Sequence, residues 1–482
     1  MNNMIRKSSY NYIGIACMSL FCGACNIPAA MQKTADKNVP ASYNVDVAKD
    51  STNSAQLNWK NFFTDPYLAG LIDTALLHNQ ELNITSQEIE ISRNEVRARK
   101  GEYLPFVGLE AGAGIDKVGR YTSQGAGDAS TEITPGKEVP DVLPDYLIAL
   151  RASWEIDIWK KLHNAKKAAV ERYLASIEGR HFMVTHLIAE IAHSYYELLA
   201  LDNQLSIVKK NIDIQNNALS IVRQQKSAAR VTELAVRRFE AQVLYTQSLQ
   251  YGIQQQITET ENKINFLLGR YPQPIARSTQ SFDDLIPKQI HPGMPSQLLA
   301  YRPDVRKAEQ EMEAAKLDVK VARAKFYPSL GISTAFGYEA FNPSYFIKTP
   351  QSLLFSLAGD LTAPLINRNA IKASYYTASA KQIQTVYNYE RVLLNSYVEV
   401  ANQLSKISNL EKSYDLKSQQ VANLSLSVNI SNNLFKSTKA DYMEVLLTQK
   451  DALEAKFELI ETKKQQLNTL VDIYQSLGGG WQ

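Results

Sequence analysis

The chain contains two copies of one supersecondary unit, and this internal repeat limits its possible folds more than any other feature. The segment Tyr103-Leu-Pro-Phe-Val-Gly-Leu109 returns as Phe326-Tyr-Pro-Ser-Leu-Gly-Ile332. Each copy opens a strand-like run, which is followed by a second run and then by a long helical pattern. Matching positions of the two copies are 223 residues apart in sequence at the first run but only 207 residues apart at the second. The first half therefore carries extra residues between its two strands, and the duplication predicts a quasi-symmetric wall.

Four runs of the sequence alternate apolar side chains with small or charged ones, at about 104–116, 146–158, 328–340 and 352–364. Ten residues is about the length of a tilted transmembrane strand, and this alternation is typical of a barrel with lipid outside and water inside. A soluble antiparallel sheet with one buried face gives the same alternation, so that alternative stays open at this point. Four strands cannot close a barrel around a channel. Closure therefore requires several copies of the chain.

The rest of the chain is dominated by long helical patterns, with no proline between Pro144 and Pro272 or after Pro364. Helical pattern runs from about Leu68 to Glu102, and again from Lys160 to about Lys226, which is roughly 100 Å of helix. An apolar heptad seam follows in the second stretch, broken only by Gln215. Its members are Leu201, Leu205, Val208, Ile212, Leu219 and Val222. The seam is consistent with a curved helical wall or with an ordinary intramolecular bundle.

Two short breaks interrupt the long helices, near Ser227–Thr232 and near Ser437–Ala440. Both breaks fall far along the chain from the strand-like runs. We expect each to be the tip of a helical hairpin. A Pro-rich, non-periodic segment from Leu268 to Pro295 links the two halves.

The N-terminus has the pattern of a secretory signal. Arg6 and Lys7 precede the apolar stretch Tyr12–Phe21, which is too short to span a bilayer. It ends in Cys22-Gly-Ala-Cys25, which predicts a lipoprotein signal over residues 1–24 and a lipid on Cys25. Two alternatives are a CxxC redox or metal pair and cleavage by the general signal peptidase. Asn26 in place of Asp permits sorting to the outer membrane, and residues 25–56 are expected to form an extended tether.

Charge and motifs argue against several classes of function. The net charge of +3 provides no electrostatic footprint for nucleic acid. The sequence contains no GxSxG, P-loop or HExxH motif, and His181, His186 and His193 are spaced by five and seven residues rather than the four that place a zinc pair on one helix face. We therefore expect no enzyme activity, no metal site and no cofactor other than the covalent lipid.

Five short segments carry distinctive local motifs: Gly293–Glu309, Phe326–Leu330, Leu361–Leu365, Tyr474–Trp481 and Trp154–Trp159. These segments resemble the TolC-like outer membrane factors, in particular the lipoprotein subfamily of resistance–nodulation–division (RND) efflux systems. The resemblance covers nearly the whole mature chain, although Tyr301 and Lys160 stand where the family usually has Arg and Gly.

The resemblance implies a mixed α/β membrane protein that assembles as a homotrimer. In such a trimer, four strands per protomer form a twelve-stranded transmembrane β-barrel, and the helices form a long α-helical barrel across the periplasm. The first repeat would cover residues 57–290 and the second residues 291–482. The partners implied are a periplasmic adaptor protein, an inner-membrane pump and outer membrane lipid.

The resemblance also implies a closed periplasmic aperture lined by acidic residues. Glu444 matches the family position of an Asp, and Asp441 lies on the same tip. Some members carry a further Asp where this chain has Leu447. Glu444 is equally consistent with a solvated charge on a helix face.

Together these features predict a passive exit duct of a tripartite efflux system. It would be lipid-anchored in the outer membrane, with a long periplasmic extension, and would carry drugs or other small toxic compounds. The alternatives are the outer membrane component of a type I secretion or heavy-metal efflux system, and a structural envelope lipoprotein. The chain contains only eight Met residues, and this low number argues against a dedicated soft-metal path. The sequence does not identify the cargo.

Overall fold

The computed structural model describes residues 27–43, 53–278, 282, 285, 291–437 and 439–481, and the chain forms two compact units. The first unit comprises Met1–Thr34, Ile91–Tyr173 and Gln310–Val386. The second comprises Ala35–Glu90, Leu174–Glu309 and Tyr387–Gln482. Each unit therefore contains segments of both sequence repeats.

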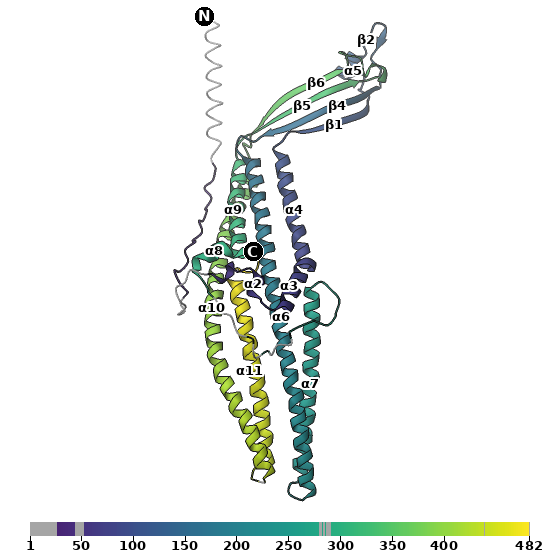
Figure 1. The fold of residues 1–482 in the computed structure, drawn as a ribbon. Coiled ribbons are helices and arrows are strands. Elements are labelled where there is room, and N and C mark those ends of the chain that lie inside the picture. Colours follow the sequence, from purple (N-terminus) through teal and green to yellow (C-terminus); the bar gives the residue numbers. More distant parts are fainter. Residues whose placement is uncertain are drawn as a thin grey trace. The chain divides into compact units, whose positions relative to one another are not determined.

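Long helices make up most of the chain (Figure 1). They are α3 (Pro66–His78), α4 (Gln80–Glu102), α6 (Lys161–Ser227), α7 (Glu233–Leu267), α9 (Pro303–Ala324), α10 (Asn369–Lys436) and α11 (Tyr442–Ser476). Shorter pieces are α2 (Trp59–Phe62), α5 (Ser123–Asp128) and α8 (Leu298–Tyr301), with 3-10 turns at Ser54–Gln56, Pro295–Gln297 and Pro343–Tyr345. No helix in the described ranges is both long enough and apolar enough to cross a membrane.

The helical pattern expected from Leu68 to Glu102 is broken at Asn79 rather than continuous. Asn79 ends α3 in an extended conformation, and its side-chain oxygen accepts a hydrogen bond from the Leu82 amide at 3.0 Å. Its side-chain amide donates to the Leu267 carbonyl at 2.9 Å. An Asn side chain that caps the following turn competes with continuation of the helix, which explains the break.

The first unit contains a four-stranded antiparallel sheet. Its strands are β1 (Phe106–Asp116), β4 (Leu143–Ile156), β5 (Ser329–Ala340) and β6 (Leu353–Thr362), in the order β1-β4-β5-β6. The two strands of each repeat are therefore neighbours, and the repeats meet where β4 pairs with β5. β1, β5 and β6 lie within the runs expected from the alternation, whereas β4 begins three residues before its expected run, at Leu143.

The loop between the first two strands is longer than its counterpart. Residues 117–142 separate β1 from β4, whereas residues 341–352 separate β5 from β6. The longer loop contains α5 and a small two-stranded sheet, β2 (Glu132–Thr134) and β3 (Lys137–Glu138). The extra residues inferred from the falling repeat offset are in this loop.

Two tryptophans of one motif each bind one copy of the repeated Pro-centred segment, just before β1 and β5 begin. The Trp154 indole donates to the Tyr103 carbonyl at 3.0 Å. The Trp159 indole donates to the Pro328 carbonyl at 2.7 Å and stacks on Tyr327 with ring centroids 4.5 Å apart. The motif between Trp154 and Trp159 therefore joins the two repeats at this end of the sheet.

The second unit contains two helical hairpins, formed by α6 from Leu174 onward with α7 and by α10 from Tyr387 onward with α11. The heptad seam of α6 is buried, Leu205 only partly, and forms clusters with Ile253 and Phe239 of α7. The seam therefore packs within the chain, as the bundle interpretation allowed. Gln215 is also buried, and neither polar atom of its side chain has a hydrogen-bond partner among the described residues.

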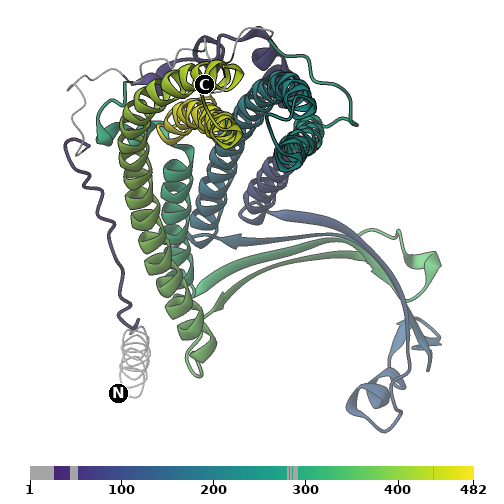
Figure 2. The same cartoon turned by 90° about the horizontal axis from the view of Figure 1, so that it is seen from below.

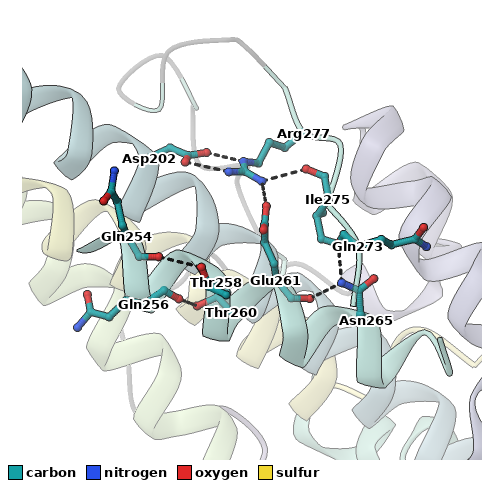
Figure 3. A network of polar contacts seen from close by, with 10 residues as sticks. All are labelled: Asp202, Gln254, Gln256, Thr258, Thr260, Glu261, Asn265, Gln273, Ile275 and Arg277. Atoms are coloured by element: carbon teal, nitrogen blue, oxygen red, sulfur yellow. Dashed lines mark hydrogen bonds and ion pairs between the residues drawn. The ribbon is translucent and has the colours of Figure 1, made fainter. Parts of the chain in front are cut away.

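The start of the segment that links the repeats is fixed by a polar network (Figure 3). Arg277 pairs with Asp202 of α6, with an Nε to Oδ2 distance of 2.5 Å, and with Glu261 of α7. The Asn265 side-chain amide donates to the Gln273 carbonyl at 2.7 Å. Desolvation opposes the charge of Arg277, but its bonds to Asp202 and Glu261 prevail and raise its pKa. Two carboxylates around one guanidinium thus fix this linker to the helices.

The expected tether is only partly covered by the described residues. Residues 27–40 have no regular secondary structure, and Gln382 of α10 both accepts from the Lys33 amide at 3.2 Å and donates to its carbonyl at 2.7 Å. Farther along, Tyr43 stacks on Tyr397, with ring centroids 5.4 Å apart. The signal peptide and Cys25 lie outside the described residues.

Candidate functional site

The sheet has one apolar and one polar face, and the strand register shows which residues share each face. Leu109, Leu150, Phe336 and Phe355 lie opposite one another across the four strands. Leu109, Phe336 and Phe355 are exposed by 69%, 56% and 76%. A row of large, exposed apolar side chains is unfavourable in water and suits contact with lipid.

The opposite face carries small and charged residues and is the concave side of the sheet. A Cβ atom at Gly337 would lie 2.1 Å from the Ile148 carbonyl oxygen and 2.4 Å from the Ala149 Cα. Side chains crowd on the inner side of a bend, so only glycine fits there. The four strands curve together along their length (Figure 2). The polar face is thus the one that a closed barrel would turn inward.

One ion pair lies on this concave face, between Arg151 of β4 and Glu110 of β1. In the register, Arg151 is opposite Gly108 and Glu110 is opposite Ala149, so the pair is diagonal. The two side chains border a hollow of about 490 Å³. Both residues occupy polar positions of their alternating runs, but their pairing depends on the register between the strands.

The second hairpin tip carries the two acidic residues predicted for the aperture. Asp441 precedes α11 as its N-cap residue, and Glu444 lies in the first turn. Both are exposed, and the Glu444 amide donates to the Asp441 carbonyl at 3.2 Å. A carboxylate in the first turn interacts favourably with the helix dipole. In a single chain the two residues occupy an exposed tip, and their role at an aperture remains a prediction.

The two hairpin tips pack on each other. Val236 at the first tip and Val445 at the second, which the repeat pairs in sequence, are buried in one apolar cluster. Phe239 and Phe435 belong to the same cluster. Near it, Arg238 lies 3.4 Å from the Met443 sulfur. The tips therefore form one contiguous surface.

An ion-pair network that no sequence motif had indicated stabilises the first tip. Lys226 at the end of α6 pairs with Glu233 at the start of α7, and Arg237 contacts both Glu233 and Glu240. Hydrogen bonding from Lys226, together with the charges of Lys226 and Arg237, holds the pKa of Glu233 below its usual range. The high density of Lys, Arg and Glu residues around position 230 was the sequence signal from which this network could have been predicted.

The three histidines of α6 do not form a common site. The His181 ring stacks on Trp481, with centroids 4.5 Å apart, and His193 pairs with Asp472 at 2.9 Å. His186 lies 3.4 Å from the Gln475 side chain. In the part of the chain that the structure describes, no group of three or more His, Cys, Asp or Glu residues is arranged to hold a metal ion.

The Arg-Pro-Asp segment that opens the second repeat forms a structural clamp. Arg302 is only 5% exposed and pairs with Asp304 at 2.6 Å and with Glu399 of α10 at 2.7 Å. It also donates to the Ser476 carbonyl at 2.9 Å, at the end of α11. This guanidinium satisfies a terminal helix carbonyl and joins three helices.

A curved antiparallel sheet with an apolar outer face, connected to helical hairpins of this length, defines the class of outer membrane channels. The family model described as "Outer membrane efflux protein" matches residues 71–270 and 294–479. The chain belongs to this family, and it is an efflux component of the outer membrane with a long periplasmic helical part.

Curated relatives support the assignment over nearly the full length. The chain is 26% identical over 468 residues to the pyoverdine export outer membrane protein OpmQ of Pseudomonas aeruginosa, covering 97% of this chain and 96% of the relative. It is 25% identical over 475 residues to the cation efflux system protein CusC of Escherichia coli O6:H1, covering 97% and 98%.

Solved structures share the fold. The outer-membrane channel OprN has a TM-score of 0.82 at 22% identity, covering 94% of this chain and 100% of that chain. The open state of the Neisseria gonorrhoeae MtrE outer membrane channel also has a TM-score of 0.82 at 22% identity, covering 94% and 99%. The fold class expected from the sequence is thus confirmed.

Proposed function

We propose that three copies of the chain form the exit duct of a tripartite efflux system. The observation that carries this proposal is the open, two-faced sheet. β1 and β6 are edge strands with one side unpaired, and four strands are too few to enclose water. Three copies, placed edge to edge, would give twelve strands with their apolar faces toward lipid and their concave faces toward a channel.

Exposed apolar side chains on the helices support assembly with further copies. They include Leu244 and Tyr251 on α7 and Leu394, Leu416 and Leu426 on α10, each exposed by 59–70%. Isolated apolar residues are common on protein surfaces, but long helices with such residues along their length are typical of helices that pack against a neighbour. Adjacent protomers would cover them and extend the wall into a closed tube.

The proposed duct is passive and catalyses no reaction. A periplasmic adaptor would bind the contiguous surface of the two tips, and an inner-membrane pump would supply the energy. Relatives named for pyoverdine export, cation efflux and solvent efflux are similar to this chain over 88–97% of its length. The proposed cargo is therefore a small toxic compound selected mainly by the pump.

The proposal includes a lipid on Cys25, which would anchor the mature N-terminus in the outer membrane. Mass spectrometry of the N-terminal peptide decides this point, because a lipidated peptide begins at Cys25 with the mass of the acyl chains. An unmodified peptide that begins elsewhere contradicts the anchor but leaves the channel proposal intact.

The assembly and its role are tested together in cells. Native mass measurement of the protein extracted in detergent is expected to give three chains per particle. Deletion of the gene is expected to raise accumulation of a fluorescent efflux dye as much as deletion of the cognate pump, with restoration by the wild-type gene. A monomeric particle, or a deletion without effect where the pump deletion has one, contradicts the proposal.

A further inference from the structure

The concave face of the sheet is lined mostly by side chains too short to obstruct a channel. Two adjacent rows across the four strands illustrate this. One row is Gly108, Arg151, Ala335 and Ser356, and the next is Glu110, Ala149, Gly337 and Leu354. Arg151 and Glu110 are the long polar side chains of these rows, and each is about half exposed.

Arg151 is also the sole basic residue within β1, β4, β5 and β6. Acidic residues occur on the same face on either side of it. Glu155, which pairs with Lys161 of α6, and Asp360 lie toward the end of the sheet that joins the helices, whereas Asp145 and Glu339 lie toward the loops. The pair with Glu110 therefore places the face's one positive charge between two acidic zones.

We propose that Arg151 and Glu110 form the selectivity constriction of the membrane-spanning part of the duct. This inference depends on the proposed closure of the sheet by further copies. In the closed barrel each protomer would contribute one Arg151–Glu110 pair, and the pairs would form a belt at one level. Between small side chains, this belt would set both the local width and the local charge.

The net charge of the belt depends on the opposite charges of Arg151 and Glu110. With both residues present, the pair contributes no net charge, and Arg151 locally offsets the acidic zones. Removing Arg151 leaves Glu110 unbalanced in every protomer, whereas removing Glu110 leaves an unbalanced guanidinium. In a narrow channel with low-dielectric walls, a ring of like charges changes the local concentration of ions and of charged cargo.

The proposal is tested by ion selectivity in planar bilayers, with the full-length assembled protein and KCl gradients. We expect Arg151→Gln to raise the cation-to-anion permeability ratio at least about twofold, and Glu110→Gln to lower it by a similar factor. Both effects should grow as the salt concentration falls, because screening weakens. The charge swap Glu110→Arg with Arg151→Glu restores the net charge and should return the ratio to near its wild-type value.

A matched control separates charge from size. Ser356→Gln adds a long neutral side chain to the row of Arg151 and should reduce conductance without changing the permeability ratio. Equal ratios in wild type and both single variants overturn the proposal, as do shifts in the same direction. A wild-type protein that does not conduct at all contradicts the proposed duct itself, so the two failures are distinguishable.

Discussion

Phe336 on β5 lies directly opposite Phe355 on β6, and both aromatic side chains are exposed on the apolar face of the sheet. Their neighbours along the strands, Ala335 and Ser356, are opposite each other on the concave face. One step along a strand therefore moves a side chain from the proposed lipid contact to the proposed channel.

This alternation predicts different outcomes when a charge is introduced at two neighbouring positions of a strand. Phe355→Arg should impair outer membrane assembly, because a charge on the lipid face costs about 2–4 kcal/mol at mid-membrane. Ser356→Arg, one residue away, should assemble at nearly wild-type yield. The measurement is the amount of folded oligomer in outer membrane fractions, and the same comparison applies to Ile332→Arg and Ser333→Arg. Equal losses at the two positions of a pair would show that the faces are assigned wrongly.

Lys160 adopts a backbone conformation that suits glycine better. Its φ angle is +58°, in the left-handed region, and it directly precedes α6. The Lys160→Gly variant should raise stability by about 1 kcal/mol, because glycine avoids the steric conflict of Cβ. Lys161→Gly, at the first residue of α6, should lower it. Apparent melting temperatures of the two variants check this, and a lower value for Lys160→Gly contradicts the prediction.

Asp157 supports the start of α6 through a charge-dependent contact. Its Oδ2 accepts from the His163 amide at 2.8 Å and lies 2.7 Å from the His163 ring. Desolvation favours the protonated form of Asp157, but the bonds from His163 prevail and hold its pKa below its usual range. This contribution to stability is present above the ordinary pKa and is lost as pH falls through the lowered one.

Asp157→Asn should therefore lower the melting temperature at neutral pH, because an Asn oxygen can still accept from the His163 amide but lacks the charge that strengthens the contact. The difference in melting temperature between variant and wild type should shrink as pH falls below about 4, because the wild-type carboxylate becomes protonated at acidic pH. Melting curves of both proteins from pH 7 to pH 3 measure it. A gap that stays constant with pH contradicts the role of the charge.

Glu444 carries the prediction about the periplasmic aperture. If three copies converge near the symmetry axis, their carboxylates repel one another and attract cations. Glu444→Ala should then raise single-channel conductance and lower cation selectivity. Leu447→Ala is the control, since it removes an apolar side chain three residues away. Unchanged conductance and selectivity in Glu444→Ala would identify Glu444 as a solvated surface charge.

Much of the fold could be predicted from the sequence because its periodicities are strong. A period of two determines the face of each strand residue, so the lipid-facing and concave sets were predictable without the register. The hairpin tips were predictable because short breaks interrupt otherwise continuous helices. The break at Asn79 was missed, because a single capping side chain interrupts a pattern that remains helical on both sides.

The candidate site was harder to predict from the sequence than the fold. The pairing of Glu110 with Arg151 depends on a diagonal contact between strands, which no local pattern reveals. The left-handed conformation of Lys160 could have been suspected, because the related proteins usually have glycine there. The role of Arg302 as a clamp required the end of α11, which lies 174 residues away in sequence.

The central claim is that the assembled protein is a passive water-filled duct, and ion conductance tests it most directly. The purified oligomer, reconstituted into planar lipid bilayers without any pump or energy source, is expected to give discrete and reproducible conductance steps. Bilayers that contain the assembled protein yet stay electrically silent would contradict the duct and favour a structural role in the envelope.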